Sequence, residues 1–424
     1  MEKKSLAARD RAVVWHPFTP QLPVQDAVAL VRGEGALLFD ESGRSYVDAT
    51  ASWWVNLHGH AHPYMAAKIS AQLHTLEHAI FSGFTHAPAV ELAERLLARL
   101  PYMSKVFYSD DGSTAVEVAL KMALQYWHNK GTPRTRIIAF ENAYHGDTFG
   151  AMSAGARNVF SRAFGPLLFD VVHIPVPLPG CESKSLEALR SALDHHAAAF
   201  IAEPLVQGAG GMVMYEASAL DALYSLCKAQ GVPVIVDEVM TGFGRTGTWF
   251  ASDQQHVKPD MICLSKGLTG GFLPLGATLC TEAVHAPFLT ADRTRTFFHG
   301  HSYTANATAC AAALASFDLM EQEHTQQQIS RLAATQQAQV EKLNAHPAIA
   351  QARCKGTIAA FELRSTQETS YLNPISERVH PFFLERGVIL RPLGNIIYIL
   401  PPYCITEEQL KQVYTALDEF LETC

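Results

Sequence analysis

Residues 234–271 read VIVDEVMTGFGRTGTWFASDQQHVKPDMICLSKGLTGG, and the fold is organised around this stretch. It opens with an unbroken β-branched run at 234–236, the pattern of a strand buried on both faces of a parallel sheet. That run ends at Asp237, and a second apolar run at 261–264 leads to Lys266. Open α/β sheets bind their ligands at the carboxyl ends of the strands. We therefore expect Asp237 and Lys266 to follow adjacent parallel strands and to face one crevice.

Asp237 and Lys266 are the pair of side chains that pyridoxal phosphate (PLP) requires. The lysine forms a Schiff base with the cofactor, and the acid pairs with the nitrogen of its pyridine ring. Taken alone, an aspartate at a strand end is commonly a turn residue, and a lysine is commonly solvated. Lys266, however, lies between an apolar run and LTGG at 268–271, where a solvated lysine gains nothing obvious. The two residues together indicate a PLP site.

The same stretch contains GFGRTG at 242–247, which matches the G-x-G-x-x-G pattern of dinucleotide-binding turns. Such a turn opens a helix at once, whereas Thr248, Trp249 and Phe250 are poor helix formers. The glycines also follow an acidic pair and not the strand itself. We therefore interpret this segment as a structural turn and reject a nicotinamide dinucleotide site.

Composition narrows the class of protein. A chain of 424 residues predicts two or three domains at ~150 residues per domain. Its 48% hydrophobic and 17% charged residues are ordinary for a globular enzyme. The net charge of -8 and the lack of a long basic run argue against a nucleic-acid partner. No apolar run approaches the ~18–20 residues of a membrane span, so we expect no membrane partner.

Cysteine usage points to a reducing compartment. The eight cysteines are scattered without a C-x-x-C pair, which favours neither a disulfide framework nor a zinc site. The N-terminus shows no apolar core of a signal peptide. We expect a cytoplasmic protein without a metal site.

Strand-like and helical segments alternate through the middle of the chain. The strand-like runs lie at 137–140, 171–174, 198–202, 234–236, 261–264 and 277–280. This alternation predicts an α/β fold with a large, mostly parallel α/β/α domain.

The last third of the chain has a different order of predicted helices and strands, which predicts a smaller α+β domain. A long Ala/Gln-rich helical region at 305–343 precedes strands at 356–363, 388–391 and 395–400 and a capped terminal helix at 406–421. We expect three parts: residues 1–57 as an N-terminal segment of the small domain, 58–305 as the large PLP-binding domain, and 306–424 as the C-terminal small domain.

Further functional candidates follow strand ends. A strand, a Gly-Ser turn and a strong helix place free N–H groups at Gly112 and Ser113, where we favour phosphate binding over simple capping. Tyr144 is well placed to lie over a flat cofactor ring. His145 comes next, but in a chain with nineteen histidines we interpret it as structural. Glu203 adds a carboxylate at the same sheet edge.

The N-terminal segment contributes aromatic residues. Trp53 and Trp54 are adjacent, and neighbouring side chains on a strand point to opposite faces. We expect one tryptophan in the core and the other at a pocket. Residues 11–23 lack periodicity and are expected to form an extended arm packed on the body.

Over essentially its whole length the chain resembles the class III, fold-type-I PLP aminotransferases. The stretches that carry the resemblance are WHPF (15–18), SWWVNLHGH (52–60), DGSTAVEVALKMALQYW (111–127), YHGDTFGAMS (144–153), AEPLVQGAGGM (202–212), VDEVMTGFGRTG (236–247), LSKGLTGG (264–271), FHGHSYTAN (298–306) and RPLGNIIYILPPY (391–403).

The resemblance assigns roles at the matching positions. It implies three catalytic residues: Lys266 forms the Schiff base, Asp237 pairs with the pyridine nitrogen, and Tyr144 covers the ring. It implies PLP binding by Gly112, Ser113, Tyr144, Asp237 and Lys266, with Gly300, His301 and Ser302 of a second subunit completing the phosphate site in a homodimer. The substrate pocket is expected to include Trp53, Tyr144, Lys266, Gly300 and Arg391, and the planar guanidinium of Arg391 suits the far carboxylate of a long keto acid.

Within the family, the motifs favour 8-amino-7-oxononanoate as amino acceptor and S-adenosylmethionine as donor, a step of biotin biosynthesis. Relatives that use adenosylmethionine carry Tyr where this chain has Phe18, and the alternative interpretation is that lysine is the donor. A second departure is Asn306-Ala307, where the family often has Asn-Pro; we expect it to alter only a helix start.

Two other classes stay open. Another class III enzyme, such as an ω-amino-acid or diamine aminotransferase or an aminomutase, would share every cofactor motif. Trp53, the WHPF arm and Arg391 argue against it. A nicotinamide-dependent oxidoreductase would need the turn at 242–247.

Overall fold

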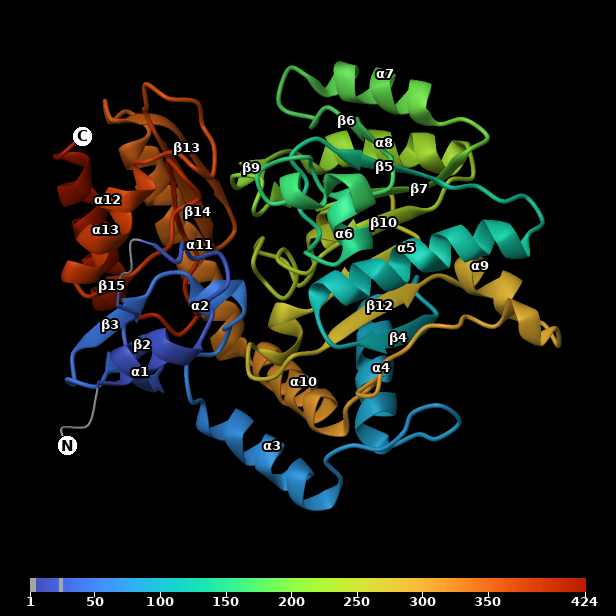
Figure 1. Cartoon of the computed structure of the whole chain (residues 1–424), viewed down its shortest axis with the longest axis horizontal. Coiled ribbons are helices and arrows are strands. Elements are labelled where there is room, and N and C mark those ends of the chain that lie inside the picture. The colour runs from blue at the N-terminus through green and yellow to red at the C-terminus, as the bar shows by residue number, and fades with distance from the viewer. Residues whose placement is uncertain (1–4, 23–25) are drawn as a thin grey trace.

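The computed structural model describes residues 5–22 and 26–424, which form two lobes (Figure 1). The larger lobe is built on a seven-stranded sheet of order β4-β12-β11-β10-β7-β5-β6. Its strands are β4 (Lys105–Ser109), β5 (Arg136–Phe140), β6 (Val171–Ile174), β7 (Ala197–Ala202), β10 (Val234–Asp237), β11 (Met261–Leu264) and β12 (Gly276–Cys280). The six alternating strands expected from the sequence are therefore present, and β4 is the strand expected before the Gly-Ser turn at residues 112–113.

The sheet is mostly parallel, as expected. Strands β6, β5, β7, β10 and β11 pair in parallel, and β12 alone runs against its neighbours β11 and β4. Strand β10 lies directly beside β11, with Asp237 opposite Cys263. The adjacency expected for the strands that carry Asp237 and Lys266 is confirmed.

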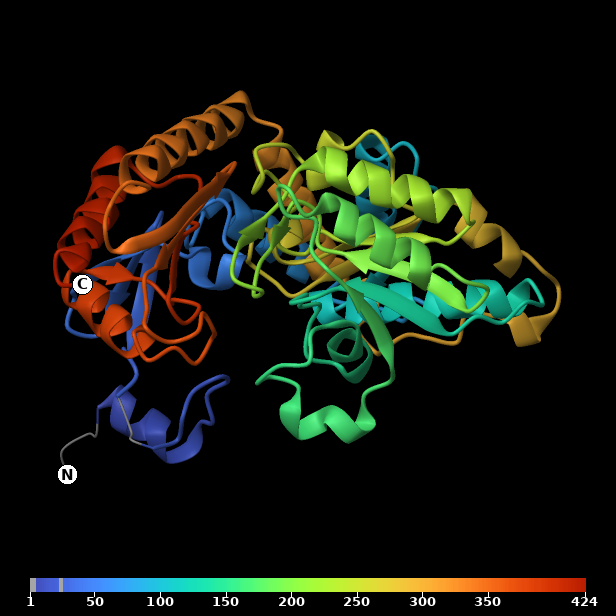
Figure 2. The same cartoon turned by 90° about the horizontal axis from the view of Figure 1, so that it is seen from above.

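Helices cover both faces of this sheet, so its strands are buried on both sides. Ile235 packs in one core cluster with α5 (Gly112–Asn129), whereas Val234 and Val236 pack in another with α8 (Ala217–Ala229). Alternate residues of a strand face opposite ways, so one strand contributes to both cores. Figure 2 shows α8 and α5 on opposite sides of the sheet. Other elements of this lobe are α3 (Pro63–Thr75), α4 (Ala87–Arg99), α6 (Phe149–Ala154), α7 (Glu182–Ala192), α9 (Glu282–His285), and a hairpin of β8 (Val206–Gln207) and β9 (Val213–Met214).

The smaller lobe joins the two ends of the chain. Strands β1 (Leu30–Glu34), β2 (Leu37–Asp40) and β3 (Ser45–Asp48) form one sheet with β15 (Val388–Ile389), which pairs in parallel with β3. A second sheet consists of β13 (Ile349–Lys355), β14 (Ile358–Leu363) and β16 (Ile396–Ile399). Its helices are α1 (Leu6–Val13), α2 (Ala51–Trp54), α11 (Glu323–Leu343), α12 (Ser376–Glu385) and α13 (Glu407–Leu421). Helix α1 and the C-terminus both lie on this lobe in Figure 1.

The helical region at 305–343 is two helices and not one, which corrects the sequence expectation. Helix α10 (Ala307–Met320) ends before Gln322, whose extended backbone (φ -69°, ψ 136°) starts α11. Neither Gly nor Pro marks this break, so no local stop signal was available. Helix α10 packs against α3, α4 and the turn after Lys266, all in the larger lobe. We therefore propose that the small domain resumes near residue 322 and not at 306; the other boundaries stay proposals.

Three further differences concern local structure. Strand β13 and helix α12 were not anticipated, and α1 makes the start of the N-terminal arm helical as far as Val13. Residues 51–54 form a helical turn and not a strand. The expectation that one tryptophan is buried and the other open is confirmed, since Trp54 is 5% and Trp53 40% exposed. Residues 23–25 of the expected arm lie outside the described residues.

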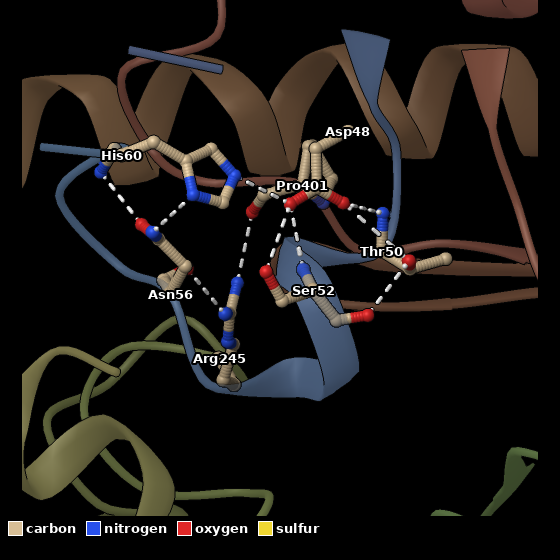
Figure 3. Close-up of polar contacts among 8 residues, drawn as sticks. Asp48, Thr50, Ser52, Asn56, His60, Arg245 and Pro401 are labelled. Carbon is tan, nitrogen blue, oxygen red and sulfur yellow. Dashed lines mark hydrogen bonds and ion pairs between the residues drawn. The ribbon is translucent and has the colours of Figure 1, made fainter. Parts of the chain in front are cut away.

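A buried arginine connects the lobes (Figure 3). Arg245, in the loop after β10, donates from Nη1 to the carbonyl of Pro401 at 2.9 Å and from Nη2 to that of Asn56 at 3.0 Å. Its own carbonyl accepts the N–H of Thr357 at 2.9 Å. One residue of the larger lobe thus bonds three separate segments of the smaller one.

In the described part of the chain, no helix has the length and apolarity needed to cross a bilayer.

The turn at Gly356 makes a close approach across this interface and generates a stability prediction. Gly356 has φ +57°, and a Cβ there would meet backbone atoms of Thr246 and Gly247. Gly356→Ala should lower the free energy of unfolding by about 3 kcal/mol through overpacking and left-handed strain. Gly231→Ala is the matched control, because Gly231 has φ +64° with open space around it, and it should cost only about 1 kcal/mol. Equal shifts of the two variants in thermal or urea unfolding would contradict the close approach.

Candidate active site

A cavity of about 790 Å³ lies at the carboxyl ends of β10 and β11 and takes its walls from both lobes. Asp237, Lys266 and Tyr144 line it from the larger lobe, and Trp53 and Arg391 from the smaller. Gly112 and Ser113 also line it. Seven of the ten site residues expected from the sequence therefore meet in one place.

Lys266 is the first residue of a 3-10 turn after β11 and adopts a left-handed backbone, with φ 47°. Such a conformation is uncommon for a residue with a side chain and is concentrated at functional sites. Its Nζ lies 4.7 Å from the centre of the Trp54 ring. Burial lowers the pKa of Lys266 to about 8, although the negative charges of Asp237 and Glu203 oppose that shift. Burial therefore brings the neutral form of the amine much closer to physiological pH than in a free lysine.

Asp237 is buried at the end of β10, and each of its oxygens has a partner. Oδ1 accepts the N–H of Val239 at 3.0 Å, and Oδ2 lies 2.8 Å from Nδ1 of His145. His145 is itself buried, and its Nε2 has no hydrogen-bond partner among the described residues. The interpretation of His145 as merely structural missed this contact. Its position directly after Tyr144, at the carboxyl edge of the sheet, was the signal that could have found it.

Glu203 supports the same edge from β7. It accepts the N–H of Tyr144 at 3.1 Å and that of Gly208 at 2.8 Å. Burial raises its pKa to about 7. Burial likewise raises the pKa of the Tyr144 phenol, so that side chain stays neutral over the cavity.

The N-terminus of α5 fits a phosphate group. The cap is Asp111, whose carboxylate accepts the N–H of Thr114 at 2.8 Å. The backbone N–H of Asp111 in turn donates to the Thr114 hydroxyl. Ser113 is therefore not used as the cap, and its Oγ accepts the N–H of Thr148 at 3.0 Å. A Cβ on Gly112 would meet the side chain of Val239, so only glycine leaves this first turn open. Free N–H groups and the helix dipole then favour an anion.

Aromatic side chains form the outer wall of the cavity. Phe18 packs edge-on against Trp53 at 5.4 Å and against Phe160 at 5.8 Å, and Phe160 packs against Tyr371 at 4.7 Å between ring centres. Sequence reasoning missed Phe160 and Tyr371 because both lie in irregular loops, where no periodicity points to a pocket. The wall offers an apolar surface for a long or flat substrate.

Arg391 is held inside this wall without an acidic partner. Its Nη2 donates to the carbonyl of Phe18 at 3.0 Å and to the hydroxyl of Tyr371 at 3.3 Å, and its guanidinium lies 5.0 Å from the Trp53 ring centre. No carboxylate of residues 5–22 or 26–424 forms an ion pair with it. A cation oriented by neutral groups keeps donors available for a substrate carboxylate.

Gly300, His301 and Ser302 are the three expected residues that do not line the cavity. His301 Nε2 lies 3.9 Å from Asp110 at the cavity rim, and the carbonyl of Ser302 accepts from His78 Nε2 at 2.6 Å. The single chain does not bring them to Lys266, and a role for them depends on a second subunit.

The glycine-rich turn at 242–247 is structural. Residues 241–246 are buried, and a Cβ on Gly244 would meet Ile329 and Tyr403 of the smaller lobe. A short 3-10 turn, Ala251–Gln254, follows instead of an α-helix. A buried loop cannot approach a pyrophosphate, which confirms the rejection of a dinucleotide site here.

The lowered pKa of Lys266 predicts the pH dependence of its reactivity. In the cofactor-free protein about half of these amines should be neutral at pH 8, and reactivity should be lost as the pH falls through that value. Modification of Lys266 by a small amine-reactive reagent, followed by mass spectrometry, should level off above pH ~9. A free lysine amide in the same solution, with a pKa near ~10.4, should keep gaining reactivity. Parallel profiles would refute the shift.

Comparison with known proteins identifies the family. The profile of class-III aminotransferases matches residues 21–421. The chain is 48% identical to the adenosylmethionine-8-amino-7-oxononanoate aminotransferase of Synechococcus elongatus, over 96% of this chain and 98% of that protein.

Solved structures agree. The crystal structure of adenosylmethionine-8-amino-7-oxononanoate aminotransferase from Methanocaldococcus jannaschii matches with a TM-score of 0.95 and 35% identity, over 99% of both chains. A PLP-bound amine transaminase from an uncultivated Pseudomonas species matches with a TM-score of 0.91 and 33% identity, over 97% of this chain and 98% of that one. The fold is that of the fold-type-I PLP-dependent transaminases, and the chain belongs to the class-III aminotransferase family.

Proposed function

We propose that the protein is a PLP-dependent aminotransferase that converts 8-amino-7-oxononanoate into 7,8-diaminononanoate, with S-adenosylmethionine as amino donor, in biotin biosynthesis. The observation that carries the chemistry is the convergence of Lys266 and Asp237, from adjacent parallel strands, on one cavity. The names of the relatives support the choice of substrates.

The residues of the cavity fit PLP. The open first turn of α5 at Gly112 and Ser113 suits the phosphate, Tyr144 suits one face of the ring, and Asp237 suits the pyridine nitrogen. When bound, the cofactor supplies an aldehyde for the amino group and an aromatic ring that withdraws electrons from the neighbouring carbon.

The side chains then divide the work of two half-reactions. With PLP bound, Lys266, whose pKa burial lowers to about 8, would accept the proton of the substrate carbon as a neutral amine and later return it. Asp237 keeps a proton on the ring nitrogen, and His145 orients Asp237 through their 2.8 Å contact.

The pocket also suits an acceptor with a long chain and a terminal carboxylate. Arg391 presents its unpaired guanidinium donors to the carboxylate, and the aromatic wall of Phe18, Trp53 and Phe160 covers the aliphatic chain. Other class III enzymes share the cofactor residues, so Arg391 and this wall are the features that favour 8-amino-7-oxononanoate over a simple amine.

We also propose a homodimer with shared active sites. Gly300, His301 and Ser302 lie outside the cavity of their own chain. Around them, the apolar side chains Ile80, Phe84, Phe298 and Tyr303 are between 64% and 74% exposed, which is typical of a surface that another subunit covers. A partner covering this patch would present Gly300, His301 and Ser302 to the phosphate of the neighbouring site.

Cysteine usage favours the cytoplasm as location, because all eight thiols are free, and cell fractionation tests this.

Lys266→Ala should abolish steady-state transamination, because among the described residues that line the cavity no other lysine is present to move the proton. A loss of at least about 10³-fold is expected from removal of a positioned acid–base group. Reduction of the native, yellow enzyme with borohydride should bleach it and label Lys266. Lys184→Ala, at an exposed lysine far from the cavity, is the control. Near-parental turnover by Lys266→Ala would overturn the assignment.

The amino donor should be adenosylmethionine, with Phe18 making it a weaker one. The ring of Phe18 keeps the aromatic wall, and the missing hydroxyl costs roughly 0.5–1.5 kcal/mol. Phe18→Tyr should therefore raise kcat/KM for adenosylmethionine by up to about tenfold. Single-turnover mixing of the PLP enzyme with adenosylmethionine, lysine and a panel of ω-amines measures each donor separately. Rapid reaction with lysine and none with adenosylmethionine would show that lysine is the donor.

Loss of PLP should accompany dissociation of the dimer. Sedimentation of the holoenzyme over a dilution series, with cofactor absorbance recorded in the same cell, measures both. His301→Ala should raise the dissociation constant of PLP while leaving the internal Lys266 geometry unchanged. A monomer that retained cofactor and activity would contradict shared sites.

A further inference from the structure

A network of polar groups centred on the buried Asp48 has no part in the chemistry described above (Figure 3). Asp48, the last residue of β3, is fully buried. Its Oδ1 accepts the N–H of Thr50 at 3.1 Å, and its Oδ2 accepts the N–H of Ser52 at 2.6 Å and lies 2.9 Å from Nε2 of His60. A buried carboxylate is tolerated when several donors meet it.

The hydrogen bonds fix the tautomer of His60. Asn56 accepts the N–H of Gly59 with Oδ1 at 2.7 Å, so its Nδ2 is the donor to Nδ1 of His60 at 3.3 Å. The other ring nitrogen, Nε2, therefore carries the proton and donates to Asp48. Three N–H groups thus converge on this carboxylate, two of them from the turn that follows β3.

That turn is strained. Ala51, Ser52 and Trp54 have φ of 50°, 61° and 67°, and none of them is glycine. Ser52 also has ψ -92°, outside the helical regions of either hand. Positive φ at three of four consecutive residues persists only where the surroundings impose it. The bonds from Thr50 and Ser52 to Asp48 are the contacts that impose it here.

The strained turn directs two indole rings to different groups of the active site. Trp53 projects into the cavity, edge-on to Phe18 and under the guanidinium of Arg391. Trp54 turns inward, with its ring 4.7 Å from Nζ of Lys266 and edge-on to Tyr398 at 5.8 Å. A relaxed turn would move both rings, because their positions depend on the same few backbone angles.

We propose that Asp48 and His60 are positioning residues of the active site. They hold the turn at 51–54 in its left-handed form and thereby set Trp53 against Arg391 and Trp54 against Lys266. The inference rests on the proposed function only for the identity of the substrates. Neither residue touches the cavity, so both act through the turn.

Asp48→Asn is the direct test, because an amide cannot accept from all three N–H groups. In the holoenzyme it should raise KM for the acceptor about tenfold or more, since small displacements of positioning groups have effects of this size. It should also change the circular dichroism of the bound cofactor, because Trp54 lies beside Lys266. His60→Leu removes one donor of three and should cause a smaller change of the same kind. If Asp48→Asn yields no folded holoenzyme, His60→Leu is compared with the control variant in its place.

Asp221→Asn is the matched control. Asp221 also accepts two backbone N–H bonds, from His256 and Val257, but it lies on α8 away from the cavity. It should lower Tm without changing KM or the cofactor spectrum. A purely structural role for Asp48 would make the two variants alike, and that result would overturn the proposal.

Ser52→Gly in the Asp48→Asn background tests the physical reason. Glycine adopts the backbone of Ser52 without strain. The double variant should therefore have a KM between those of Asp48→Asn and the parental enzyme, and its cofactor spectrum should return toward the parental one. No recovery would refute control through the turn. Parental enzyme that reacted with no acceptor would instead refute the proposed function, while the cofactor spectra would still decide the role of Asp48.

Discussion

The parallel pairing of β10 with β11 is the constraint on which the active site depends. Because the two strands run parallel in one register, both end at the same edge of the sheet. Asp237 closes one strand and Lys266 follows the other, so an acid and an amine meet although 28 residues separate them in the sequence. Apart from Asp237 at the end of β10, the two strands are apolar, since each is covered by helices on both faces.

The second lobe turns this sheet edge into an enclosed cavity. It supplies Trp53, Tyr371 and Arg391, and it is fastened to the first lobe by Arg245, a fully buried cation that bonds the carbonyls of Asn56 and Pro401. Burial lowers the pKa of this guanidinium, which shows how strongly the interface is shielded from water. Buried polar groups of this kind fix one arrangement of the lobes, because any other arrangement would leave them unsatisfied.

Local strain is concentrated around the cavity. Phe18, Trp54 and Lys266 all line it and all have positive φ, as do Ala51 and Ser52 just behind it. Such conformations are unfavourable in isolation and are maintained by tertiary contacts. They place side chains where regular helices or strands would not, which explains why a strand assignment for the two tryptophans was wrong although the burial of one and exposure of the other was correct.

The amino-acid sequence alone determined the α/β class, the strands of the large sheet, the helix start at Gly112 and the convergence of Asp237 with Lys266. These follow from short-range signals: apolar runs, glycines and the residues directly after them. Tertiary structure alone decided the contact of His145 with Asp237, the wall formed by Phe160 and Tyr371, the break between α10 and α11, and the turn that Asp48 holds. Each of these depends on a partner that is distant in the sequence or on a backbone angle that the local residues disfavour, so no pattern in the chain records it.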